Sequence, residues 1–167
     1  MRAIRFSFLI GLIFFVVAPV VGQQRATHEL HSMMIYNFLK YIEWPNGKNN
    51  GEFVIAVIDD DKVYNTLNDW YGNKTRGSKT FKIIKASSSD DLTQYQLVYL
   101  GKGASASLDG VLSKVADQPV LTITAKKGLA EKGSCINFRV IDNRLKFELK
   151  QNAIAKTSIK TSSQLAA

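Results

Sequence analysis

The feature that most constrains the fold is an uninterrupted apolar run from Phe53 to Ile58. Successive side chains of a strand point to opposite faces of a sheet, so a strand without polar positions must be covered on both faces. The run ends at three aspartates, Asp59 to Asp61, which favour the start of a helix. The sequence therefore predicts a buried central strand, followed at once by a helix that reaches about Tyr71.

The alternation of strands and helices continues along the chain. Further strands are expected at residues 81–86, 97–100 and 120–124, and further helices at residues 27–43, 105–116 and 152–159. Thr27 is the expected cap of the first helix, and Pro45 is expected to stop it. The pattern predicts an α/β fold with a mostly parallel central sheet and helices on both faces.

The C-terminal part has a different pattern. Apolar residues alternate with polar ones at 136–140 and again at 145–149, which is typical of strands with one buried face. Asp142 and Asn143 lie between these segments, and both residue types tolerate the left-handed backbone of a tight turn. We therefore expect a C-terminal antiparallel β-hairpin appended to the parallel sheet.

The N-terminus has the pattern of a cleavable signal peptide. Arg2 and Arg5 precede an uncharged apolar stretch that ends at Val17, and small residues lead to Gly22. The stretch is shorter than the roughly 20 residues that span a membrane. We expect cleavage after Gly22, export from the cytoplasm, and no membrane insertion of the mature chain.

The mature chain, residues 23–167, is predicted to be one domain, because its 145 residues suffice for a single core. Losing the two signal-peptide arginines lowers the formal net charge from +8 to +6. The lysines are dispersed, so solvated faces are favoured over a nucleic-acid site. Cys135 is the only cysteine, so no intrachain disulfide can form, and its apolar surroundings favour a buried side chain over a redox switch.

Motifs for hydrolytic or metal-dependent chemistry are missing. His28 and His31 are one residue too close for the zinc-binding HExxH pattern, and no third ligand is evident nearby. No serine stands in a Gly-x-Ser-x-Gly elbow. We therefore expect both histidines to be exposed polar residues, and the protein to be no enzyme and to need no metal or cofactor.

Fold geometry indicates where a small ligand would bind, since α/β proteins gather ligands at the carboxyl ends of their strands. Asp59 and Asp60 follow the central strand, and Lys102 and Gly103 follow the strand at 97–100. Helix capping is the simpler explanation of the aspartates, and an ordinary turn is the simpler explanation of the glycine-rich loop. If a ligand binds, these four residues are the candidates.

A second candidate site is a compact group before Pro45. Tyr41, Glu43 and Trp44 are candidate partner-binding residues, because exposed aromatic side chains make good anchors in protein interfaces. Trp44 has an alternative role as a lid on the core, which the sequence slightly favours.

Several segments, taken in order, carry a more specific signal. They are MIYNFLKYIEWP at 34–45, the strand at 53–58, QLVYLG at 96–101, VLTIT at 120–124, Gly133 with INF at 136–138, LKFEL at 145–149, and residues 159–165. In their order and spacing they resemble the YfiR/HmsC-like family of exported bacterial proteins. The resemblance covers nearly the whole mature chain.

The resemblance implies a periplasmic, non-enzymatic repressor. Its best understood members bind the periplasmic domain of an inner-membrane diguanylate cyclase and hold it inactive, which lowers cyclic di-GMP and biofilm formation, and they tend to be homodimers. Those members carry several cysteines, whereas this chain has only Cys135, so redox control is not carried over. Because related domains also occur with sensor histidine kinases, a small-ligand-binding sensory protein for such a kinase is the alternative.

Overall fold

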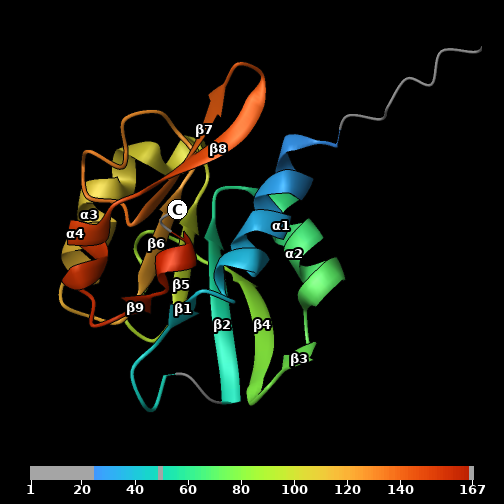
Figure 1. Cartoon of the computed structure of the whole chain (residues 1–167), viewed down its shortest axis with the longest axis vertical. Coiled ribbons are helices and arrows are strands. Elements are labelled where there is room, and N and C mark those ends of the chain that lie inside the picture. The colour runs from blue at the N-terminus through green and yellow to red at the C-terminus, as the bar shows by residue number, and fades with distance from the viewer. Residues whose placement is uncertain (1–24, 49–50, 166–167) are drawn as a thin grey trace, which may run out of the picture.

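The computed structural model describes residues 25–48 and 51–165 and contains a seven-stranded sheet (Figure 1). The predicted signal peptide lies outside the described residues and stays a prediction. The strand order is β3-β4-β2-β5-β6-β7-β8. The strands are β2 (Gly51–Ile58), β3 (Thr75–Arg76), β4 (Lys79–Lys85), β5 (Leu97–Leu100), β6 (Leu121–Thr124), β7 (Ile136–Ile141) and β8 (Arg144–Leu149). The five strands from β4 to β7 in this order pair in parallel, and β3 and β8 pair antiparallel at the two edges.

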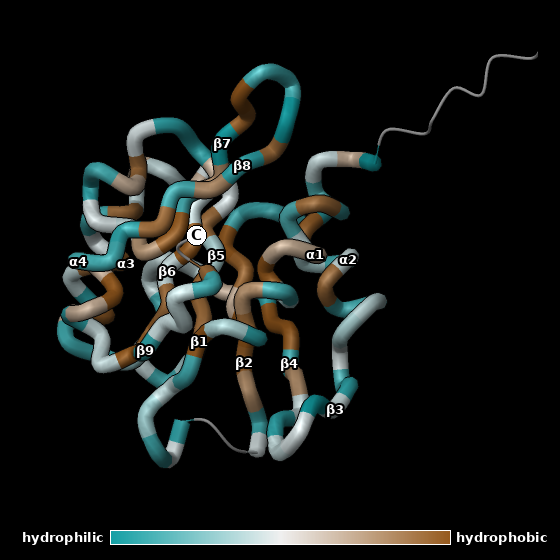
Figure 2. Tube along the Cα trace, viewed as in Figure 1, coloured by the Kyte–Doolittle hydropathy of each residue, from teal (hydrophilic) through white to brown (hydrophobic). Residues whose placement is uncertain are grey.

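Helices cover both faces of the sheet, which confirms the predicted fold class. One face packs against α1 (Thr27–Phe38), α2 (Asp61–Tyr71) and α4 (Gln151–Ala155), and the other against η1 (Gly103–Ser107) and α3 (Leu108–Lys114). In β2, Phe53, Ile55 and Val57 enter the first core, whereas Ala56 and Ile58 enter the second. Figure 2 shows this hydrophobic character along the central strands. The apolar run therefore reflects a strand buried on both sides, as predicted.

The order of the strands creates a switch point between β2 and β5. From β2 the chain passes through α2 to β4 on one side, and from β5 it passes through α3 to β6 on the other. The connections diverge at the carboxyl ends of β2 and β5, and α/β sheets commonly bind ligands at such a point. This edge positions the candidate site.

The predicted C-terminal hairpin is confirmed. β7 and β8 pair antiparallel in register from Ile136 opposite Leu149 to Ile141 opposite Arg144. Asp142 and Asn143 form the turn with φ angles of 50° and 57°, the left-handed conformation that a two-residue hairpin turn requires. Figure 1 shows the hairpin projecting beyond the body of the sheet.

The predicted boundaries of the first and last helices are wrong. Helix α1 ends at Phe38, and Ile42–Glu43 form a short strand, β1, that pairs with β9 (Lys160–Thr161). The last helix ends at Ala155, before β9 and the turn η2 (Ser163–Leu165). The two paired segments are far apart in the sequence, so no local periodicity predicts their pairing.

Two smaller expectations also need correction. Ala26, not Thr27, is the N-cap residue of α1, and it makes no side-chain capping hydrogen bond. The segment expected as one helix at 105–116 starts earlier, as the 3-10 turn η1, and becomes α-helical only at Leu108.

Candidate functional site

Two aspartates, Asp59 and Asp60, follow β2 and have different structural roles. Asp59 adopts a left-handed conformation with φ of 55°. Asp60 is the N-cap of α2, where its Oδ1 accepts a hydrogen bond of 3.1 Å from the backbone N–H of Val63. Capping satisfies one of the amides that a helix start leaves without an intrahelical partner. The capping explanation of Asp60 is therefore confirmed.

The loop after β5 runs directly against Asp59. A Cβ atom at Gly101 would overlap the backbone carbonyl of Asp59, and a Cβ atom at Gly103 would overlap its side-chain carboxylate. The backbone N–H of Gly101 also donates to the carbonyl of Ile58, at 2.8 Å. The two loops at the switch point are thus closely packed, and Lys102 lies exposed between the glycines.

A buried chain of polar groups connects α1 to this point. The Tyr99 hydroxyl donates to Oδ2 of Asp60 at 3.2 Å, and Nδ1 of His31 lies 3.0 Å from the same hydroxyl. Because a hydroxyl has one proton, His31 Nδ1–H is the donor to Tyr99 when Tyr99 donates to Asp60. The His31 ring stacks on Phe138 with centroids 4.4 Å apart.

His31 is therefore not the exposed polar residue that the sequence suggested, since it is only 4 % exposed. Burial lowers the pKa of His31 from 6.5 to about 4, the charge of Asp60 opposes that change, and Lys102 adds to it. Burial also raises the pKa of Tyr99, and Asp60 raises it further. At neutral pH both side chains are uncharged and are hydrogen-bonded inside the fold.

Next to His31 lies an open cavity of about 350 Å³ at the carboxyl edge of the sheet. Four cationic side chains line it: Lys102 after β5, Lys126 and Lys127 after β6, and Arg139 on β7. Phe138, Val140 and Leu145 supply apolar lining from the hairpin, and His31 and Thr27 line the side formed by α1. The cavity combines positive charge with apolar surface.

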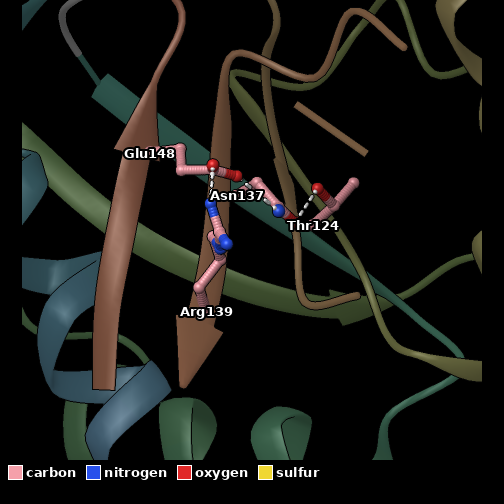
Figure 3. Close-up of polar contacts among 4 residues, drawn as sticks. All are labelled: Thr124, Asn137, Arg139 and Glu148. Carbon is pink, nitrogen blue, oxygen red and sulfur yellow. Dashed lines mark hydrogen bonds and ion pairs between the residues drawn. The ribbon is translucent and has the colours of Figure 1, made fainter. Parts of the chain in front are cut away.

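A polar network fixes the cationic side chain on β7 (Figure 3). The Thr124 hydroxyl donates to Asn137 Oδ1 at 2.8 Å, and Asn137 Nδ2 donates to Glu148 at 3.1 Å. Glu148 forms an ion pair with Arg139 across the hairpin. Burial raises the pKa of Glu148, but the hydrogen bonds from Asn137 and Arg139 outweigh it, and the pKa is lowered. The network holds Glu148 ionised and Arg139 in place beside the cavity.

The comparisons with known proteins decide the family. A family model described as YfiR/HmsC-like matches residues 28–167. The chain belongs to the YfiR/HmsC-like family. This family is known for periplasmic regulators of cyclic di-GMP signalling. A search of curated proteins finds no match to the chain.

In this YfiR/HmsC-like chain, the four candidate ligand-binding residues lie at the same edge of the sheet, as predicted, but they do not line one common site. They are Asp59, Asp60, Lys102 and Gly103. Lys102 lines the cavity. Asp60 is connected to the cavity only indirectly, by hydrogen bonds through Tyr99 to the cavity-lining His31. Asp59 and Gly103 lie where the two loops pack together. Within the described ranges, no three His, Cys, Asp or Glu side chains gather as a metal site.

Sequence reasoning missed the lysines after β6. Lys126 and Lys127 follow the strand expected at 120–124, so the rule that singled out Lys102 also applied to them. No sequence signal predicted that Arg139 lines the cavity, because its position there depends on the pairing of β7 with β6.

The predicted partner-binding group has a different environment from the one expected. Trp44 is 3 % exposed, its Nε1–H donates to the carbonyl of Gln96 at 3.0 Å, and its ring meets Phe53 edge-on at 4.7 Å. Trp44 is thus a core residue and offers no exposed anchor. Tyr41 is half-buried and Glu43 is exposed, so a role of these two in binding stays a prediction.

Cys135 is buried, as predicted, and burial raises the pKa of its thiol. Across residues 25–48 and 51–165, no helix has the length and apolar character that crossing a membrane requires.

Proposed function

We propose that this protein is a non-enzymatic periplasmic regulator that binds the periplasmic domain of an inner-membrane diguanylate cyclase and holds the cyclase inactive. Membership of a family of cyclic di-GMP regulators supports this class of partner. The structural observation that carries the binding role is the exposed apolar tip of the β7–β8 hairpin.

Val140 and Ile141 are the large apolar residues that stand out as exposed in the described part of the chain, at 63 % and 36 %. They are consecutive on β7 near the tip of the projecting hairpin, where Figure 2 shows a hydrophobic stretch, so one apolar side chain is exposed on each face of the tip. Covering such a side chain contributes roughly 1.5–3 kcal/mol. The tip therefore gains stability when a partner protein covers it.

The charges around the tip favour an acidic partner surface. Arg144 and Lys146 are exposed on β8, against the single carboxylate of Asp142 in the turn. The predicted mature chain is also basic, with a formal net charge of +6. Opposite charges on a partner speed association and disfavour wrong partners. We expect the partner surface to present carboxylates around an apolar patch.

The polar groups at the switch point support a non-enzymatic role. Asp60 caps α2, and Tyr99 and His31 bond to one another and to Asp60. A general base or nucleophile needs a free atom directed at a substrate. The Asp60 carboxylate, the Tyr99 hydroxyl and Nδ1 of His31 instead form hydrogen bonds within the fold.

The proposal is tested by capture of the cyclase. The tagged chain, expressed in its own bacterium, should co-purify a membrane diguanylate cyclase, and its deletion should raise cellular cyclic di-GMP. Val140→Asp and Ile141→Asp should each weaken binding of the purified periplasmic domain by at least about tenfold, since charge would enter an apolar contact. Thr80→Asp is the control, because Thr80 is an exposed strand residue at the other end of the sheet.

Capture of no cyclase and unchanged cyclic di-GMP would refute the proposed function. Unchanged affinity of both folded hairpin variants would refute the hairpin as the contact. We also propose that the protein is a homodimer, as the family resemblance implies, and sedimentation of the exported chain at micromolar concentration tests this.

The cavity beside His31 favours a second candidate function, a small-ligand-binding sensory protein that works with a sensor histidine kinase. Its lysines and apolar wall are suited to a small charged molecule. Recovery of a histidine kinase in the same capture experiment, in place of a cyclase, would favour this alternative.

A further inference from the structure

Three lysines that line the cavity form no ion pair in the described part of the chain. Lys102, Lys126 and Lys127 form no ion pair with any residue that the structure describes, whereas Arg139 is paired with Glu148. The three ammonium groups come from two neighbouring loops, after β5 and after β6. Among the described residues, the lining itself contains no carboxylate that offsets these three positive charges, although the Asp59 carboxylate lies against Gly103, next to Lys102.

Concentrating like charges around one cavity costs electrostatic energy, which a bound anion would remove. Lysine ammonium groups act as compact point charges and bind phosphate oxygens without a fixed planar geometry. The one guanidinium at the site, that of Arg139, is already engaged by a carboxylate. The site thus lacks a free fork for planar recognition of a carboxylate and is better matched to a phosphate.

Apolar side chains also line the cavity. Phe138, Val140 and Leu145 contribute hydrophobic surface, and the last two face each other across the β7–β8 ladder. The volume of about 350 Å³ lies at the lower end of the range for small-molecule sites. Such a cavity has room for a small molecule with an apolar body and is larger than an inorganic ion needs.

We propose that this cavity is a binding site for a small organic phosphate monoester, with the phosphate among Lys102, Lys126 and Lys127 and the apolar body against the hairpin residues Val140 and Leu145. A dianion matches the uncompensated charge better than a monoanion does. The site adds to the proposed function and does not depend on it, because ligand binding is measured without any partner protein.

Titration calorimetry of the exported chain at low ionic strength tests the site with three probes: phenyl phosphate, inorganic phosphate and phenylacetate. Phenyl phosphate should bind with one-to-one stoichiometry. It should bind at least about tenfold more tightly than phenylacetate, which has one charge, and than inorganic phosphate, which has no apolar body. Absence of binding at millimolar phenyl phosphate, or equal affinity for phenylacetate, would overturn the proposal.

A matched pair of triple variants separates a site from general attraction to a basic protein. Lys102→Gln, Lys126→Gln and Lys127→Gln together should weaken phenyl phosphate binding at least about tenfold. The control replaces Lys40, Lys62 and Lys74 by Gln, which removes the same charge from exposed positions outside the cavity. Equal weakening in both triple variants, each with an unchanged melting curve, would show that no specific site exists.

Discussion

His31 makes the stability of this fold sensitive to acid. Its ring is buried between Tyr99 and Phe138, and burial lowers its pKa from 6.5 to about 4. The charged groups that act on it are Asp60, which favours the protonated ring, and Lys102 and His28, which disfavour it. The pKa difference corresponds to about 3 kcal/mol, at roughly 1.4 kcal/mol per pH unit.

The sign follows from which state binds the proton. Well above pH 6.5, His31 is neutral in the folded and the unfolded chain and contributes no pH dependence. As the pH falls below 6.5, the unfolded chain takes up a proton that the folded chain excludes until about pH 4. The free energy of unfolding should therefore fall across this window by about 3 kcal/mol from His31 alone.

Urea unfolding at a series of pH values from 8 to 4, followed by tryptophan fluorescence, measures this loss. His31→Gln removes the titrating group, so its stability should fall less steeply with acid, although the lost stacking on Phe138 lowers its stability by about 1 kcal/mol at neutral pH. His28→Gln is the control, since His28 lies on the same helix but is less buried. Parallel curves for the wild type and His31→Gln between pH 6.5 and 4 would refute the reasoning.

Other substitutions test the packing. Gly101→Ala should lower the free energy of unfolding by more than about 2 kcal/mol because its Cβ overlaps the Asp59 carbonyl, whereas Gly110→Ala, with open space inside helix α3, should raise it by about 0.5–1 kcal/mol. Urea midpoints distinguish these outcomes, and equal effects would contradict the close loop packing. Trp44→Ala should cost about 3–5 kcal/mol, seen as a lower calorimetric Tm, and a loss under 1 kcal/mol would contradict its core position. The Cys135 thiol should resist an aromatic disulfide reagent until urea unfolds the chain, and rapid reaction of the native protein would show that it is accessible.

Local signals predicted most of the sheet. The apolar run that forms β2 has no polar position to expose, so burial on both faces follows from its composition. The hairpin turn at Asp142 and Asn143 followed from residues that tolerate a positive φ. In both cases the decisive sequence signal lies within a few consecutive residues.

The candidate site was predictable only in part. Lys102 was found because the carboxyl end of a parallel strand is a topological position that the order of strands and helices already implies. Lys126 and Lys127 obeyed the same rule and were overlooked. The same rule could not identify Arg139. This residue lies on the hairpin, which lines the cavity only because β7 pairs with β6.

By itself, the sequence determined the class of fold, the hairpin and the family resemblance, because each depends on periodicity and motifs along the chain. Only the tertiary structure decided that β1 pairs with β9, that Trp44 and His31 are buried, and that lysines from separate loops line one cavity. These features arise from contacts between residues far apart in sequence. Whether such a side chain is exposed or buried depends on which distant segment packs over it, and a local sequence pattern does not predict that packing.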